Sequence, residues 1–556
     1  MVRATFSGFN TALSALQANQ KRLDITGQNL SNMNTAGYTR QQLEASSLNY
    51  TNPVSHYSNG NETAVGFGVS MNRVSQIRDP YLDIQYRSQS ADCSYTNRLQ
   101  TALNSLSKVL DETTISGIRQ AFDDVLSTLT SMQDPAKVSD PIYESELRTK
   151  MQSVCNLFNQ ASRQITQAEQ NEFQRLTGEG SSEQGDVQKI NDILRQIGDL
   201  NVQIKRNQIA GHPSLELQDE RNLLLDELSG YIPIETRYYK DDAHSGNNAY
   251  DYDANGAVIG KKDWPDDLEV SMNYIDAQGK SQKLILVNGS DLGANGLTKN
   301  YGQLSVLKGD HQTAASVSDP ADISIKFEKA PSYKGNGPAA TNDVYAELKG
   351  IRFEGGSLQA SLDMLQKTGT GKVINGSVDD VRGYQYYSGK LDQLASTFAE
   401  SMNDINNGKK HTDQNLLSNS TDDSTTGITA GNIGISKGWT SGTIHISTNG
   451  TNRTDTVLEM IAAMKDTTKL NGKTFADYMN NLSTQLASDS SSNQTVLKTG
   501  TTVLNSILDS RDSLSGVSLD EEATNMMAYV SAYNAASRLM TALDEVLNTL
   551  ISNTGA

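Results

Sequence analysis

Apolar residues in the last stretch of the chain, 518–551, recur at spacings of three and four. Such spacings average about 3.5 residues, the repeat of a coiled coil, and predict one long helix with a narrow apolar seam. Ser518 and Glu521 have the spacing of a capping box, which marks the start of the helix. The seam comprises Leu519, Ala523, Met526, Val530, Tyr533, Ala536, Met540, Leu543, Leu547 and Leu550. This helix needs a partner.

The first thirty residues carry a matching pattern. Their seam comprises Phe6, Phe9, Leu13, Leu16, Gln20, Leu23, Gly27 and Leu30. Gln20 and Gly27 interrupt the apolar line, and the other faces are rich in Ser, Asn and Thr, which compete with helical hydrogen bonding. Neither terminal helix should therefore be stable alone. Two interpretations follow: an ordinary coiled coil that closes one domain, or helices that become ordered only against neighbouring subunits.

Helical stripes dominate the chain between these ends. Apolar residues at helical spacing run from Pro80 to Leu228 and return at Tyr384. Two further stripes predict separate helices at 475–486 and 496–514, the second leading into the terminal helix. The long stripes are typical of an elongated helical bundle.

Strand patterns interrupt the helices twice. Short alternating runs fill 231–350 and include a hairpin with Gly279 in its turn, which predicts an inserted β domain. A second hairpin is predicted at 432–447. The fold class is therefore mainly α with an inserted β-rich domain. The domains are 1–40, the N-terminal helix of a terminal coiled-coil domain; 41–230, an arm and the first part of the helical bundle; 231–375, the β-rich outer domain; 376–515, the second part of the bundle, with a small insertion at 411–450; and 516–556, the C-terminal helix of the coiled-coil domain.

Composition narrows the possible partners. The chain has 556 residues, enough for about three or four domains, and 65 acidic against 47 basic residues give a net charge of −18. Without a Lys/Arg run, this charge makes nucleic acid and anionic membranes poor partners. No stretch approaches the roughly eighteen apolar residues of a membrane span, and the N-terminus lacks the apolar centre of a signal peptide. We therefore expect neither membrane insertion nor cleaved secretion.

Candidate chemistry is sparse. Cys93 and Cys155 lie in separate helical patterns without CxxC spacing, so we expect buried free thiols. The six histidines show no paired ligand spacing, and the half EF-hand pattern at 251–256 has Lys262 in place of the final glutamate. No HExxH or GxSxG motif occurs. We predict no catalytic residue, cofactor or metal, although carboxylates brought together by folding remain an open alternative.

Two short motifs lie at the inner ends of the terminal helices, the first within 27–40 and the second within 516–523. Their residues are Asn29, Asn32, Asn34, Thr35, Gly37, Tyr38 and Arg40, and Gly516, Leu519, Asp520, Glu521 and Glu522. These motifs resemble the signatures of bacterial flagellar axial proteins, the group that includes rod, hook and hook-associated proteins. Within the group, the helical stretches 190–211 and 217–228 resemble hook-associated proteins. The resemblance covers about three fifths of the chain and excludes most of the β domain.

The resemblance implies a structural subunit of the flagellum, not an enzyme. It would form a homo-oligomeric layer that joins the hook to the filament, with the hook protein and the second junction protein, hook-associated protein 3, as neighbours. It would be extracellular and exported without a cleaved signal peptide, with a dedicated export chaperone engaging the C-terminal helix. A hook protein and an axial scaffold carrying a hydrolase or protease in its variable region are the alternatives. The long helical body argues against the hook protein.

The two seams together form the predicted assembly interface. Its residues are Phe6, Phe9, Leu13, Leu16, Leu23 and Leu30 at one end, and Leu519, Met526, Val530, Tyr533, Met540, Leu543, Leu547 and Leu550 at the other. A narrow stripe on each helix cannot bury both flanks within one chain. We therefore expect charge at Leu16 or Val530 to abolish assembly while the bundle remains folded.

Overall fold

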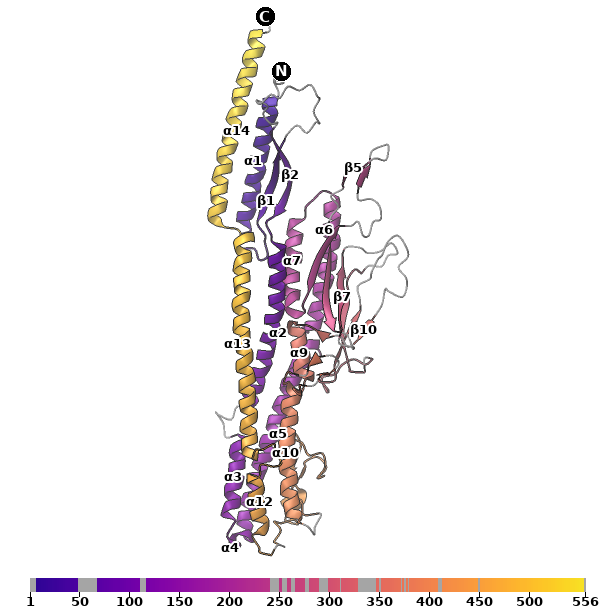
Figure 1. The fold of residues 1–556 in the computed structure, drawn as a ribbon, viewed down its shortest axis with the longest axis vertical. Coiled ribbons are helices and arrows are strands. Elements are labelled where there is room, and N and C mark those ends of the chain that lie inside the picture. Colours follow the sequence, from indigo (N-terminus) through magenta and orange to yellow (C-terminus); the bar gives the residue numbers. More distant parts are fainter. Residues whose placement is uncertain are drawn as a thin grey trace.

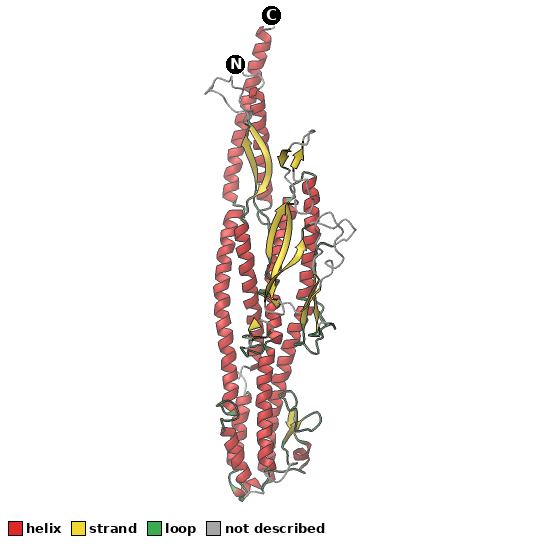
Figure 2. Ribbon diagram, turned by 45° about the vertical axis from the view of Figure 1, so that its right-hand side comes forward, coloured by secondary structure: helices red, strands yellow, loops and turns green. Residues whose placement is uncertain are grey.

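The structure is a computed structural model of the chain. It describes residues 7–48, 68–110, 117–240, 250–252, 258–261, 266–275, 280–289, 299–310, 312–328, 347–349, 352–371, 373–374, 377–378, 380–408, 413–448 and 451–554. The described chain forms an elongated molecule whose long helices run along its length, and both chain ends lie at one tip (Figure 1). Small sheets lie along one side (Figure 2). The predicted fold class, mainly α with inserted β structure, is confirmed.

The tip that holds both ends is built from two helices and a hairpin. Helix α1 (Ser7–Ser31) lies against α14 (Leu519–Thr554), and strands β1 (Gln41–Ser47) and β2 (Val69–Gln76) pair antiparallel and pack on α1. The last helix begins one residue after the expected Ser518. The two ends of the sequence are thus partners within one subunit (Figure 1).

The body is a bundle of long helices with a continuous apolar core. Its centre is aromatic: Phe122 packs edge-on against Phe158 and Phe398, and its ring stacks on Phe475 at 5.6 Å. The helices are α2 (Pro80–Leu110), α3 (Ile118–Ser131), α4 (Pro135–Val138), α5 (Pro141–Thr177), α6 (Asp186–Ile209), α7 (Leu215–Tyr231), α9 (Gly356–Gln366), α10 (Tyr384–Asn407), α12 (Asp455–Lys465) and α13 (Phe475–Ser515). Both cysteines are buried free thiols in this bundle, as expected.

Helix α13 differs from the sequence prediction. The separate helices expected at 475–486 and 496–514 are one helix of 41 residues. Its polar middle remains helical because α2 supplies partners: Gln100 Nε2 donates to Ser490 Oγ at 2.8 Å, and Asn493 Nδ2 donates to the Thr96 carbonyl at 2.9 Å. Periodicity missed this helix because its middle is held by polar contacts and not by an apolar stripe.

The inserted β structure packs on the upper part of the bundle. Strand β6 (Asp266–Ile275) pairs antiparallel with β3 (Glu235–Lys240), β7 (Ser281–Asn288) and β11 (Arg352–Phe353). The β6–β7 pairing confirms the first predicted hairpin, although its turn at 276–279 lies outside the described residues. A second sheet has the order β10 (Glu347–Lys349), β9 (Ser324–Glu328), β8 (Gln303–Leu307). Two further pairs are β4 (Tyr250–Tyr252) with β5 (Val258–Lys261) and β12 (Val373–Ile374) with β13 (Ser377–Val378).

The predicted hairpin at 432–447 is wrong. Strand β15 (Ile433–Ile435) pairs instead with β14 (Leu417–Asn419), and the chain then turns into the short helix α11 (Lys437–Ser441). The cause is Trp439, which is fully buried and donates its indole N–H to Glu144 of α5 at 2.8 Å. Burial of one large side chain thus overrides a strand pattern.

Candidate functional site

The contact of α1 with α14 and the β1–β2 hairpin includes a few buried residues, most of them small. Ala12, Ala18 and Ile25 of α1 are buried, as is Ala536 of α14. A Cβ added at Gly8 would lie 3.4 Å from the methyl groups of Leu543, so the Leu543 side chain packs over this glycine. Further along, the Arg22 guanidinium lies 5.6 Å from the centre of the Tyr529 ring. Small residues and one cation–π contact therefore define this helix pair.

The predicted seam lies only partly in this contact. Half-buried members are Phe9, Leu16, Leu23, Leu30, Met526, Met540, Leu543 and Leu547, while Leu13, Leu519, Val530, Tyr533 and Leu550 are exposed. Phe6 lies outside the described residues. On α1 the contact with α14 and the β1–β2 hairpin takes the face that carries Ala12 and Ala18, so the leucines are turned partly toward solvent.

The two sequence motifs meet where the terminal pair joins the body. Asn29 is 1% exposed, and its amide is fully used. Its Nδ2 donates to the Gln41 carbonyl at 3.0 Å and to Glu522 Oε2 at 3.3 Å. Its Oδ1 accepts from the Gln41 amide at 3.0 Å and from the Tyr38 hydroxyl at 2.9 Å. Only a side-chain amide combines two donors with an acceptor in this way.

Arg40 completes the link between the two ends. Its Nε donates to Glu522 Oε1 and its Nη1 to Glu521 Oε2, both at 2.7 Å, while its backbone N–H donates to the Ser515 carbonyl at 2.9 Å. Glu522 is almost completely buried and Glu521 is exposed. The Glu521 amide reaches Ser518 Oγ at 3.5 Å, which is long for a cap. In place of the return bond of a capping box, the Glu521 carboxylate pairs with Arg40.

A second layer of polar contacts fixes this junction to the body. Thr39 donates its backbone N–H and its hydroxyl to the Asp219 carboxylate, at 3.1 and 2.6 Å. Burial raises the pKa of Asp219, whereas these two hydrogen bonds act to lower it and only partly offset the effect of burial. Burial also raises the pKa of Tyr38, with smaller contributions from the nearby carboxylates of Asp219, Glu216 and Glu522. The Tyr38 hydroxyl therefore stays protonated and able to donate to Asn29.

Arg511 ties the end of α13 into the same region. Its Nη2 lies 2.6 Å from Asp226 Oδ2 of α7, and its guanidinium lies 4.7 Å from the centre of the Tyr86 ring of α2. Arg87 of α2 donates to the other oxygen of Asp226 at 2.9 Å. Three helices of the body thus converge below the point where α13 passes into α14. We call the whole set, from Asn29 and Arg40 to Asp226 and Arg511, the joint.

The remaining motif residues shape the turns around the joint. Gly37 has a φ of +77°, which favours glycine, and Thr35 Oγ1 donates to Asn32 Oδ1 at 3.3 Å. At Gly516, between α13 and α14, a Cβ would lie 2.4 Å from the Asp512 carbonyl oxygen. Asn34, Leu519 and Asp520 are exposed. The joint residues that sequence reasoning missed are Asp219, Asp226 and Arg511, since no spacing pattern links α7 and α13 to the termini.

The joint consists of hydrogen bonds, ion pairs and a cation–π contact. The described residues contain no cluster of three or more His, Cys, Asp or Glu side chains suited to a metal ion. None of the helices in the described ranges has the length and apolar character needed to cross a membrane. Most of the EF-hand-like pattern at 251–256 lies outside the described residues. What the arrangement does is fix the direction of the terminal helices relative to the body.

Three family models match this chain. The description of the first is flagellar hook-associated protein FlgK helical domain, over residues 103–416. Residues 9–39, which span most of α1 and most of the first motif, match the flagella basal body rod protein, and residues 511–553 match the flagellar basal body rod FlgEFG protein C-terminal region. The two rod-protein matches cover both sides of the joint.

Curated relatives agree with these matches. Flagellar hook-associated protein 1 of Bacillus subtilis strain 168 is 29% identical over 569 residues, covering 99% of both chains. The protein of the same description from Salmonella typhimurium is 29% identical over 230 residues, covering 41% of this chain and 38% of the relative.

A solved structure, that of the flagellar hook junction protein FlgK from Burkholderia pseudomallei, is 18% identical with a TM-score of 0.36, covering 61% of this chain and 44% of that chain. The match thus spans less than half of that protein. The helical-domain model, by contrast, covers more than half of the chain described here. On that match, this chain belongs to the flagellar hook-associated protein family of FlgK, a family of structural proteins of the flagellum.

Proposed function

We propose that this chain is a subunit of the layer that joins hook to filament, and that it assembles through α1 and α14. The observation that carries the proposal is the exposure of large apolar side chains on α14. Eight of its large apolar side chains remain 37% to 66% exposed although the helix is paired with α1. They are Leu519, Met527, Val530, Tyr533, Leu539, Val546, Leu550 and Ile551.

Exposed apolar residues in such number on one helix support contact with other chains. On a helical wheel, Leu519, Val530 and Tyr533 fall on one side of the α1 contact, and Leu539, Val546 and Leu550 fall on the other. Large exposed apolar side chains that gather on the flanks of one helix are typical of a protein contact site. Two flanks on one helix suit two neighbours, as in a closed layer of identical subunits.

The joint supports the same function by making the terminal pair a rigid extension of the body. In a layer under mechanical load, the direction of the helices must be the same in every subunit. The buried amide of Asn29 and the hydrogen bonds of Arg40 to two carboxylates, Glu521 and Glu522, fix that direction. The proposed neighbours are further copies of the chain, the hook protein and hook-associated protein 3.

Before assembly, the exposed face of α14 would be prone to aggregation. This supports an export chaperone that covers the C-terminal helix. The family match supports export of the chain to the flagellum outside the cell. We propose no enzymatic activity for the chain.

Imaging of hooks from cells with and without this chain tests the proposal. Without it, we expect hooks of normal length that lack the distal layer and carry no filament. A preparation in which filaments remain attached to the hooks would show that the chain acts elsewhere. Expression of the chain from a plasmid should restore the layer and provides the control.

A further inference from the structure

The small insertion predicted at 411–450 borders a hollow of about 440 Å³ on the body. Helix α5 forms one wall, and the strand pair β14–β15 with the loop after β14 forms the other. Helix α5 begins beside α4, at the end of the molecule opposite the two termini (Figure 1). The hollow therefore involves neither the joint nor the terminal helices.

The α5 wall carries a row of polar side chains. They recur at spacings of three and four, so they share one face of the helix, and all of them are exposed. The row comprises Gln152, Asn156, Gln160 and Arg163. Gln152 Nε2 donates to Asn156 Oδ1 at 2.9 Å, which leaves the N–H groups of the Asn156 amide for another acceptor. This face of α5 therefore offers several hydrogen-bond donors to a bound molecule.

Asp423 fixes the opposite wall. Its Oδ1 accepts from Ser418 Oγ at 2.7 Å and from the Lys437 backbone N–H at 3.1 Å. The residue has a φ of +62°, which is uncommon for a residue other than glycine. The hydrogen bond from Ser418, with a smaller contribution from Lys437, lowers the pKa of this carboxyl, so it is ionised at neutral pH. Asp423 therefore holds the start of α11, with Lys437, beside the hollow.

The hollow carries a surplus of positive charge although the chain has a net charge of −18. Among the residues that line it, Arg163 and Lys437 are the cations and Asp423 is the carboxylate. In the described part of the chain, neither cation lies within ion-pair distance of a carboxylate. An occupant of the hollow should therefore bring negative charge.

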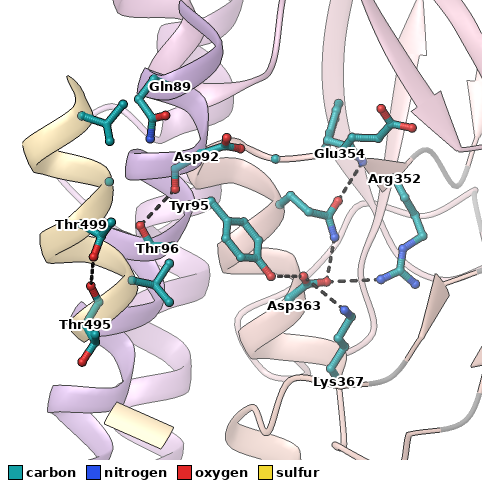
Figure 3. Close-up of a pocket in the computed structure, with 16 residues that line it drawn as sticks. Gln89, Asp92, Tyr95, Thr96, Arg352, Glu354, Asp363, Lys367, Thr495 and Thr499 are labelled. Atoms are coloured by element: carbon teal, nitrogen blue, oxygen red, sulfur yellow. Dashed lines mark hydrogen bonds and ion pairs between the residues drawn. The ribbon is translucent and has the colours of Figure 1, made fainter. Parts of the chain in front are cut away.

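The cations of a larger groove are, by contrast, already paired. This groove of about 750 Å³ lies between α2, α9 and α13 (Figure 3). Its Asp363 pairs with Arg352 at 3.2 Å and with Lys367 at 3.4 Å, and it accepts from the Tyr95 hydroxyl (Figure 3). Of these two hollows, the one beside α5 is therefore the one that offers cations to a ligand.

The hydrogen-bonding groups of the hollow narrow the class of ligand. Side-chain amides both donate and accept, as hydroxyl groups do, so a set of them suits a ligand with several hydroxyls. Asn156, Gln160 and Asn419 supply such amides here. An added peptide strand is disfavoured, because Asn159 Nδ2 already donates to the Ile433 carbonyl of β15 at 2.8 Å. The volume of about 440 Å³ is that of a small-molecule site, so a small acidic molecule rich in hydroxyls fits best.

We propose that this hollow binds a saccharide unit that carries a carboxylate. Arg163 and Lys437 attract the carboxylate, and the amides of Asn156 and Gln160 bond the hydroxyls. The inference goes beyond the proposed function and stands apart from it, because the lining residues belong to α5 and to the segment 418–437. A free oligosaccharide and a polysaccharide of a cell surface both carry this chemistry, and a polymer probe distinguishes them.

Titration of the purified chain with a fluorescent tetrasaccharide of alternating glucuronic acid and N-acetylglucosamine tests the inference. We expect saturable binding, followed by anisotropy, and none with the neutral tetramer of N-acetylglucosamine. Arg163→Ala should weaken binding about ten-fold. Asn156→Trp, which fills the hollow without a change of charge, should abolish it. Arg195→Ala, which removes an exposed cation of α6, is the matched control and should leave binding unchanged.

Several outcomes would overturn the inference. They are absence of binding to the unmodified chain, equal binding of the acidic and neutral tetrasaccharides, and equal affinities of the Arg163→Ala and Arg195→Ala variants. Equal binding of a tetraglutamate peptide would show that the hollow selects charge alone and would also overturn it. Circular dichroism checks that each variant is folded. Competition by long hyaluronan would assign a polysaccharide as the source of the ligand, and competition by the tetrasaccharide alone would assign a free oligosaccharide.

Discussion

The guanidinium of Arg40 lies 2.7 Å from the carboxylate of Glu522, although 482 residues separate them in the chain. Glu522 is buried at the start of α14, and the same carboxylate accepts from Asn29 at the end of α1. A buried carboxylate without its cation would be strongly unfavourable, so this pair holds the chain ends in one arrangement.

Replacement of Arg40 with alanine should loosen the terminal pair. The change leaves Glu522 buried without its cation, and we expect a local loss of about 2 kcal/mol, less than for a fully buried pair because Arg40 is partly open to solvent. Hydrogen exchange should then accelerate at the amides of α1 and α14 and remain unchanged in α5. Arg73→Ala, which removes an exposed pair with Glu44, is the control and should change exchange in these helices little. Equal exchange in the two variants would show that the joint does not hold the termini.

The pH dependence of the joint should follow Asp219. Burial raises the pKa of this carboxyl above its unfolded value, so the folded state binds the proton more tightly than the unfolded state. As the pH falls from 7 through the raised pKa toward about 4, this group should therefore add stability. The urea midpoint of the unmodified chain should therefore rise relative to that of the Asp219→Asn variant as the pH falls over this range. A difference that is constant with pH would contradict the assignment.

Asp310 provides a control of opposite sign. The backbone amides of Thr313 and Gln312 hold the pKa of this exposed carboxyl at about 2. Its contribution is present above the unfolded pKa and is lost as the pH falls from about 4 toward 2. Asp310→Asn should therefore change the dependence of the urea midpoint on pH only below about pH 4, whereas Asp219→Asn should change it between about pH 4 and pH 7.

The architecture of the chain was largely readable from periodicity, because long helices with apolar stripes leave a strong signal. The pairing of the two ends followed from their matching seams. The sequence did not predict which face of α1 is buried. Ala12 and Ala18 on that face are too small to stand out in an apolar pattern, yet they allow α14 and the hairpin to pack closely. A pattern of large apolar residues therefore does not reveal a contact that is made through alanines.

The candidate site was predicted only in part, for a related reason. The motifs supplied Asn29, Tyr38, Arg40, Glu521 and Glu522, which the structure brings together. Their partners on α7 and α13 could not be predicted, since a buried Asp within an amphipathic helix looks like any solvent-facing acid. Tertiary position alone separates Asp219, which binds Thr39, from its neighbour Glu220, which is exposed.

The two thiols should be present and protected. Cys93 and Cys155 are buried and unpaired with each other, and burial raises the pKa of Cys155 to about 12. A neutral thiol reacts slowly, so Cys155 should resist a thiol reagent in the folded chain at pH 8. Titration in denaturant should return two thiols per chain, and tryptic mapping after native labelling should show Cys155 unmodified. Fewer than two thiols in denaturant would indicate a disulfide or oxidation.

A charge on the exposed apolar face of α14 should block assembly and spare the fold. Val530→Asp places a carboxylate where the proposed neighbour packs, and desolvating it would cost several kcal/mol. The subunit should lose almost no stability, because Val530 is already exposed within the single chain. We expect Leu16→Asp on α1 to act in the same direction, with some loss of stability since Leu16 is half-buried. Asn534→Asp, which adds the same charge at an exposed polar position of α14, is the matched control. Complementation of cells that lack the chain, scored by attached filaments, separates the variants. If Val530→Asp restored filaments as well as Asn534→Asp, the exposed face of α14 would not be the assembly surface.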